Sequence, residues 1–138
     1  MITFDTNILI YAAHPRAPAK QRIALDLLLA AESGVLVWQV ACEFIAASRK
    51  LAPHGFTRAE AWDQLTHHLR SFPLILPTPA ILERARSFHV EQQWSFWDAM
   101  IVQAALHAGC TRLLSEDFQD GRMFGTLLVE NPFSAARS

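Results

Sequence analysis

The N-terminal stretch MITFDTN, residues 1–7, decides the fold of this chain. Its short apolar run breaks into an acid and two small polar residues, a pattern typical of a buried strand that ends in a turn. In open α/β sheets, ligands bind outside the carboxyl ends of the strands, so Asp5 is placed for chemistry. Asp5 could equally cap the next helix or form an Asx-turn. The choice depends on whether other carboxylates reach the same edge.

The composition limits the class of protein. The chain has 138 residues, 51% of them hydrophobic, which suits a single domain spanning residues 1–138 with one core. Twelve Lys and Arg residues stand against 13 Asp and Glu, and the net charge of -1 argues against a protein that coats nucleic acid non-specifically. Any contact with RNA must therefore be local.

The cysteines and the hydropathy pattern predict a soluble, cytosolic protein. Cys42 and Cys110 lack the spacing of a zinc site, and we expect both to be free, buried thiols. No secretory signal is recognisable before Ile2, and no apolar run approaches the ~20 residues that span a bilayer.

Strand and helix patterns alternate along the chain. Apolar runs predict a first strand at the N-terminus and further strands at residues 35–40, 74–76, 111–114 and 126–129. Amphipathic spacing predicts helices at residues 8–11, 19–33, 41–51, 57–70, 79–91 and 95–108. This alternation predicts a three-layer α/β/α fold around a central, mostly parallel sheet of about five strands.

Three finer expectations concern individual residues. Gly34 should end the second helix. His67 and His68 should lie on the surface, because adjacent helical positions point about 100° apart and cannot share a metal. The helix that begins at Pro79 should bury Ile81, Leu82, Ala85 and Phe88.

Four acids fall close to the ends of these elements. Asp5 follows the first strand, Glu43 lies just after the second in the first turn of its helix, and Asp117 follows the fourth. Because the carboxyl ends of parallel strands share one edge, these acids should converge there with Asp98, in the first turn of a buried helix. Asp98 could instead form a capping box with Ser95, and Glu43 could instead stabilise its own helix by interacting with the positive end of the helix dipole.

A group of carboxylates at one edge of the sheet is expected to bind a cation that neutralises their charge. Carboxylates within a few ångströms repel one another and destabilise the fold unless a cation neutralises them. Mg²⁺ or Mn²⁺ is the natural occupant, and Mg²⁺ takes its remaining ligands from water and substrate phosphate, which indicates phosphodiester chemistry. The chain has no Walker A loop and no GxGxxG motif.

The motifs that carry these acids resemble those of the PIN-domain ribonucleases, and most closely the toxins of VapBC-type bacterial toxin–antitoxin pairs. The matching stretches extend from Ile2 to Phe133 and comprise FDTN at 4–7, QVACEF at 39–44, SFWDA at 95–99, LSEDF at 114–118, and NPF at 131–133. Each motif is weak alone, but the ordered set of Asp, Glu, Asp and Asp is specific.

This resemblance implies a PIN-like fold and a Mg²⁺-dependent endoribonuclease, with Mn²⁺ as a possible substitute, that is inhibited by a small antitoxin encoded beside it. The catalytic and metal-binding acids of the family carry over onto Asp5, Glu43, Asp98 and Asp117. Asn7 and Ser115 match polar positions that hold these acids in place. Glu116 is the alternative to Asp117 as the fourth acid.

Two other functions compete with the nuclease. An aspartyl-phosphate enzyme would use Asp5 as a nucleophile, but it usually needs a second acid at position 7 and a lysine opposite, and the only lysines are Lys20 and Lys50. A non-catalytic module with the same fold could use the acidic pocket to hold a metal or a basic partner residue.

The apolar content also predicts partners. A hydrophobic fraction of 51% exceeds what one small core easily hides, so we expect a homodimer, with candidate contact residues among Trp38, Trp62, Trp94 and Trp97. We expect the antitoxin to insert an arginine among the acids and to lay an amphipathic helix on the helices that begin near Ala41 and Thr57.

Overall fold

A mostly parallel sheet forms the centre of the computed structural model, which describes residues 1–134. Its strand order is β3-β2-β1-β4-β6-β5, and only β5 runs antiparallel to its neighbour. The strands are β1 (Ile2–Phe4), β2 (Gly34–Val37), β3 (Leu74–Ile75), β4 (Arg112–Leu114), β5 (Met123–Phe124) and β6 (Leu127–Glu130). The predicted fold class is confirmed, with six strands in the described residues in place of about five.

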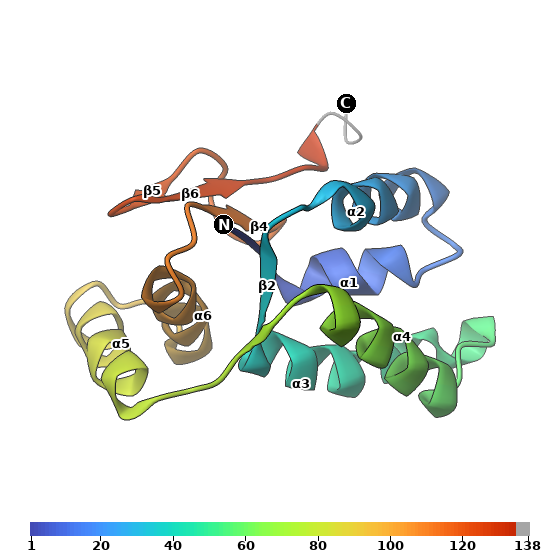
Figure 1. Cartoon of the computed structure of the whole chain (residues 1–138), viewed down its shortest axis with the longest axis horizontal. Helices are drawn as coiled ribbons and strands as arrows, with labels where there is room; N and C mark the ends of the chain where they lie inside the picture. The colour runs from blue at the N-terminus through green and yellow to red at the C-terminus, as the bar shows by residue number, and fades with distance from the viewer. Residues whose placement is uncertain (135–138) are drawn as a thin grey trace.

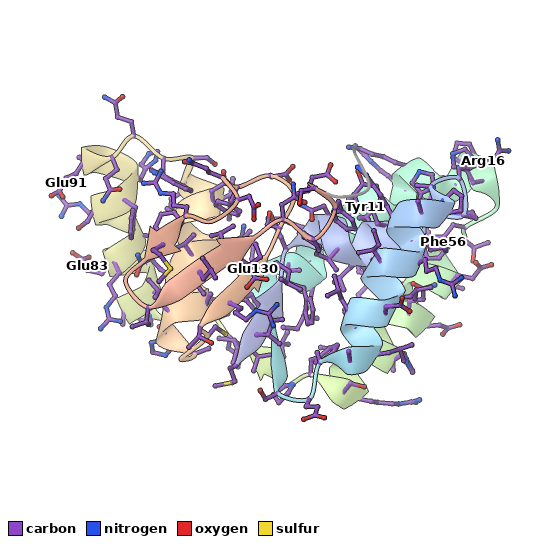
Figure 2. The ribbon with its side chains drawn as sticks, turned by 90° about the horizontal axis from the view of Figure 1, so that it is seen from above. Tyr11, Arg16, Phe56, Glu83, Glu91 and Glu130 are labelled. Carbon is purple, nitrogen blue, oxygen red and sulfur yellow. The ribbon has the colours of Figure 1, made fainter. Side chains whose placement is uncertain are left out.

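Helices cover the sheet on both sides. They are α1 (Thr6–Ala12), α2 (Pro18–Ala30), α3 (Trp38–Ala47), the 3₁₀ helix η1 (Ser48–His54), α4 (Arg58–Ser71), α5 (Pro79–Glu91) and α6 (Phe96–His107). In Figure 1, α5 and α6 pack together on one side, while α1 to α4 form a group on the other. Seen from above, Glu83 and Glu91 of α5 lie at the end of the molecule opposite Arg16 and Phe56 (Figure 2).

The first strand lies at the middle of the sheet. β1 pairs with β2 and with β4, and the backbone N–H of Asp5 extends the pairing by donating to the Leu114 carbonyl at 2.9 Å. Phe4 and Leu113 are fully buried in the core. Asp5 and Ser115 directly follow these two neighbouring parallel strands, so they lie side by side at the carboxyl ends of the strands.

Several helix and strand boundaries differ from the predicted ones. Gly34 does not end α2 but opens β2, where an added Cβ would meet the Phe72 ring at 2.6 Å. The second strand ends at Val37, and α3 begins at Trp38, so Glu43 lies in the second helical turn and not in the first. The predicted strand at 126–129 becomes β6, and the two-residue β5 before it was not predicted.

Two predictions of side-chain exposure were wrong. His68 is buried, because Ala61, Leu65 and His68 share the inner face of α4, and burial lowers its pKa to about 4. Leu82 is exposed, whereas Ile81 and Ala85 of the same helix are buried.

Further predictions have mixed outcomes. The edge position of β3 and the N-caps at Thr57 and Thr78 are confirmed. Both cysteines are free, but only Cys110 is buried, and Cys42 is exposed. Among residues 1–134, no helix is long and apolar enough to cross a membrane.

Candidate active site

Asp5 is the buried centre of the acidic edge. It is the N-cap of α1, where its Oδ1 accepts from the Thr6 backbone N–H at 2.7 Å. The Ser115 hydroxyl donates to Oδ2 at 2.6 Å, and the Asn7 amide lies 3.5 Å from the same oxygen. Asp5 thus caps a helix and also belongs to the group of acids, so the two alternatives for this residue hold together.

Burial sets the ionisation of Asp5. The side chain is about 5% exposed, and this burial raises its pKa from 3.8 to about 6. The hydrogen bonds from Ser115 and Thr6 act against that rise, while the charges of Asp117 and Glu43 add to it. The folded chain therefore holds a carboxylate whose negative charge is costly at neutral pH.

Glu43 reaches the site from α3 with both oxygens occupied. The Thr6 hydroxyl donates to Oε2 at 2.7 Å, and the Gln39 amide donates to Oε1 at 2.6 Å. Gln39 lies one helical turn before Glu43 and also donates to the Trp97 carbonyl at 3.1 Å. This single amide joins α3 to the start of α6.

Asp98 lies half-buried in the first turn of α6. Burial raises the pKa of Asp98, and the charges of Asp117 and Glu43 raise it further. Ser95 is the N-cap residue, but its side chain makes no capping hydrogen bond. The capping box that could have explained Asp98 is therefore not formed.

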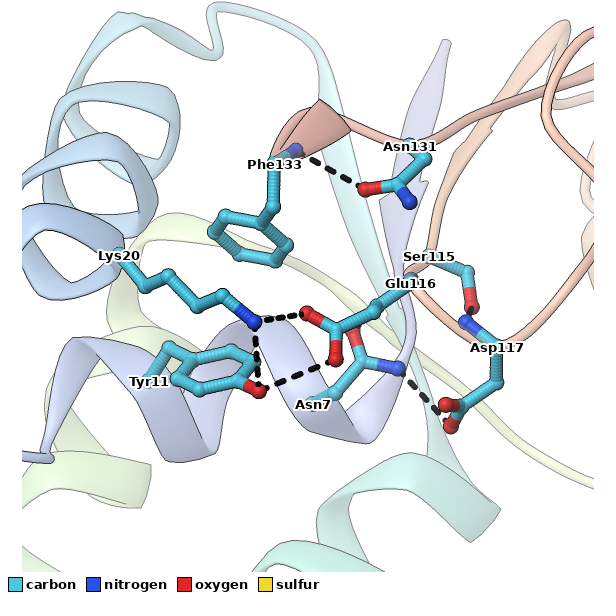
Figure 3. Close-up of polar contacts among 8 residues, drawn as sticks. All are labelled: Asn7, Tyr11, Lys20, Ser115, Glu116, Asp117, Asn131 and Phe133. Atoms are coloured by element: carbon cyan, nitrogen blue, oxygen red, sulfur yellow. Dashed lines mark hydrogen bonds and ion pairs between the residues drawn. The ribbon is translucent and has the colours of Figure 1, made fainter. Parts of the chain in front are cut away.

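The two neighbouring acids after β4 have different partners (Figure 3). The Asn7 amide donates to Asp117 Oδ2 at 3.1 Å, and the Asp117 backbone N–H donates to the Ser115 hydroxyl at 3.1 Å. Glu116 instead forms an ion pair with Lys20 at 2.9 Å and accepts from the Tyr11 hydroxyl at 3.0 Å. The charge of Asp117 acts on both Asp5 and Asp98.

The predicted acids therefore share one electrostatic environment. The charges of Glu43 and Asp117 act on both Asp5 and Asp98, and carboxylates are the hard donors that Mg²⁺ prefers. As placed in residues 1–134, no three His, Cys, Asp or Glu side chains form a group that could hold a metal ion. The donor chemistry fits such a cation, although the side chains do not stand in a closed coordination shell.

Sequence reasoning missed several polar partners of these acids. Thr6 and Gln39 lie inside the quoted motifs but were not assigned to the site. Gln39 lies one helical turn before Glu43, and this spacing is a local signal that could have identified Gln39 as a partner of Glu43. Lys20 and Tyr11 had no such signal, because they contact Glu116 across about a hundred positions of sequence, with separations of 96 and 105.

The family model described as PIN domain matches residues 2–119, which includes all four acids. No curated protein matches the chain by sequence.

Solved structures share the fold over most of the chain. A toxin–antitoxin complex from Klebsiella pneumoniae has a TM-score of 0.69 at 21% identity and covers 96% of this chain and 98% of that chain. VapBC2 from Rickettsia felis, bound to a DNA fragment from its promoter, has a TM-score of 0.68 at 16% identity, covering 95% and 98%. VapC20 from Mycobacterium tuberculosis, a sarcin–ricin loop cleaving toxin, has a TM-score of 0.65 at 17% identity, covering 82% and 87%.

The raised pKa of Asp5 predicts how stability depends on pH in the presence of EDTA. The pKa of Asp5 is about 6 in the folded chain and 3.8 ordinarily, so ionisation of Asp5 destabilises the fold. This loss of stability is absent below pH 4, grows as the pH rises and is complete above pH 6. A shift of this size corresponds to about 3 kcal/mol. Asp5→Asn should therefore unfold at a higher temperature than the wild type at pH 7, with the gap closing towards pH 4. A variant less stable than the wild type at pH 7 would contradict the assignment.

Proposed function

The chain belongs to the PIN-domain family, and from this membership we propose that it is a Mg²⁺-dependent endoribonuclease acting in the cytosol as the toxin of a toxin–antitoxin pair. The observation that carries the proposal is the convergence of Asp5, Glu43, Asp98 and Asp117: burial raises the pKa of Asp5 and of Asp98, and the charges of Asp117 and Glu43 raise both further. Such a group is unfavourable for stability and is explained if a cation occupies it. The similar toxin–antitoxin structures support the biological role.

Each acid has a part in the proposed reaction. Asp5, Asp98 and Asp117 would hold the cation with Glu43, and Mg²⁺ could keep several waters where the carboxylates stand apart. A bound cation would lower the pKa of water and offset charge on the phosphate. Hydrogen bonds orient two of the carboxylates: Asn7 donates to Asp117, and Ser115 donates to Asp5.

The hydrolysis itself is a displacement at phosphorus. Glu43 or Asp117 takes a proton from the attacking water. The water oxygen forms a bond to phosphorus in line with the leaving oxygen, whose own bond to phosphorus breaks. The leaving oxygen then takes a proton from solvent. The hydrogen bonds from Thr6 and Gln39 hold the Glu43 carboxylate in a fixed orientation, in which it can accept the proton.

A groove beside the acids suits the proposed antitoxin. It has a volume of about 780 Å³ and lies among α3, η1 and α4, and Glu43 and Thr6 are among the residues that line it. Its walls include Ile45, Phe56 and the exposed Trp62. An amphipathic helix could bury its apolar face here and present an arginine to the acids, as expected for the helices near Ala41 and Thr57.

A separate apolar face supports the proposed homodimer. Trp38 and Trp97 are exposed and line the same small pocket, with the exposed Leu76 and Leu82 next to lining residues in the chain. Of the other tryptophans, Trp62 lies in the groove described above, and Trp94 packs on Phe118 and Phe124. A second copy of the chain would cover this face.

The first test concerns catalysis. Asp98→Asn should lose at least about a hundredfold in the rate of RNA cleavage with Mg²⁺, the scale that one positioned catalytic group contributes. Asp26→Asn, the same change at an exposed acid of α2, should cleave like the wild type. Millimolar Mg²⁺ should also raise the melting temperature of the wild type, and less so that of Asp5→Asn. Wild-type cleavage by Asp98→Asn would remove the acid from the mechanism.

The second test concerns the oligomer. Light scattering should give twice the chain mass of 15.5 kDa at micromolar concentration. Leu76→Asp should reduce this to the monomer mass, because a charge at the centre of an apolar interface loses its solvation. Leu29→Asp, at an exposed position on α2, is the control and should remain dimeric. A monomeric wild type would reject the dimer.

The third test concerns the antitoxin. The chain is co-expressed with the small reading frame beside its gene, and both RNA cleavage and complex recovery are measured. The complex should survive purification and suppress cleavage, whereas Trp62→Asp in the groove should prevent its formation. Val90→Asp, at an exposed position on α5, should leave the complex intact. If wild type and partner neither associate nor affect cleavage, the toxin proposal fails even if the nuclease stands.

A further inference from the structure

We propose that Lys20, Tyr11 and Glu116 form a clamp that fixes which of two neighbouring acids, Glu116 or Asp117, faces the catalytic group. The inference rests on the proposed function, because it concerns the same acidic edge. It makes Lys20 a positioning residue that acts through Glu116 on Asp117. Figure 3 shows the three side chains of the clamp converging from α1, α2 and the segment after β4.

The clamp occupies both carboxylate oxygens of Glu116. Lys20 Nζ donates to Oε2 at 2.9 Å, and the Tyr11 hydroxyl donates to Oε1 at 3.0 Å. Lys20 also donates to the Tyr11 hydroxyl oxygen at 3.1 Å, so the three groups form a closed ring of hydrogen bonds. Charge-assisted bonds of this kind are stronger than neutral ones, and a bidentate arrangement fixes direction as well as distance.

The C-terminal segment covers the clamp. Phe133 is fully buried and packs edge-to-face on the Tyr11 ring with centroids 4.9 Å apart. Lys20 Nζ lies 4.6 Å from the Tyr11 centroid and 5.6 Å from that of Phe133. The Asn131 side chain holds this segment by accepting from the Phe133 backbone N–H at 2.9 Å. Two aromatic rings thus partly shield the ion pair from water, which strengthens it.

The clamp acts on a segment held from both sides. The Glu116 backbone N–H donates to Asn7 Oδ1 at 3.3 Å, and the Asn7 amide donates to the Asp117 carboxylate. With the Glu116 side chain tied to α1 and α2, the side chain of the next residue, Asp117, is directed to Asn7 (Figure 3). Removing the Lys20 charge would break its ion pair with Glu116 and loosen the segment that carries Asp117.

The experiment uses the full chain and compares Lys20→Met with Arg112→Met. The second variant breaks an ion pair of similar length, between Arg112 and Glu130 at 2.8 Å, that joins β4 to β6 without contacting the four acids. In metal-free protein, amide hydrogen exchange at Glu116 and Asp117 should be at least about tenfold faster in Lys20→Met, because these amides are protected only while the local segment stays closed. The amides of β1 should be unaffected, and Arg112→Met should leave Glu116 and Asp117 unchanged.

Cleavage provides the second readout. Lys20→Met should lower kcat by about tenfold with little change in KM, because the displaced acid acts in the reaction and not in RNA binding. Lys20→Arg should restore most of the rate. Should Lys20→Met not fold, Tyr11→Phe keeps the ring packing, removes the hydroxyl and allows the same comparison.

Two results would overturn the clamp. One is unchanged exchange at Glu116 and Asp117. The other is faster exchange with a wild-type kcat, which would make the clamp a structural contact alone. If the wild type cleaves no RNA, the proposed function fails, while the exchange comparison still decides for or against the clamp.

Discussion

The hydrogen bond from the Ser115 hydroxyl to the Asp5 carboxylate joins β1 and β4 at the point where both strands leave the sheet. It depends on the parallel pairing of the two strands, which brings residues 110 positions apart within 2.6 Å. Because Asp5 is buried, its charge is tolerated only with such partners, and the bond acts against the rise in pKa that burial causes. The remaining acids are arranged around this fixed carboxylate.

Each further acid adds charge from a different element. Glu43 comes from α3, Asp98 from α6 and Asp117 from the segment after β4, and a polar neighbour orients two of them, Gln39 for Glu43 and Asn7 for Asp117. The sheet thus concentrates negative charge where desolvation already opposes it. A chain under pressure for stability alone would not keep this arrangement, whereas a site that binds a cation and a phosphate requires it.

The sequence predicted the order of elements and the edge at which the acids meet, because hydrophobic periodicity and the geometry of parallel sheets are local or general rules. It misplaced the start of α3, since the apolar run through Val40 fits a buried strand and a buried helix equally. The inner face of α4 was overlooked at His68, although Ala61 and Leu65 precede it at helical spacing. The pairing of Lys20 with Glu116 had no local signal, because only the folded sheet brings α2 close to the segment after β4.

The central claim is that the four carboxylates form one cation site. Anomalous diffraction from a crystal grown with Mn²⁺ tests it most directly, because the signal locates the metal without reference to activity. The account predicts a peak at about 2.1 Å, the coordination distance of a small divalent cation, from carboxylate oxygens of Asp5 and Asp98 or Asp117. A well-diffracting crystal with no peak among these acids at millimolar Mn²⁺, or with its peak elsewhere on the chain, would contradict it.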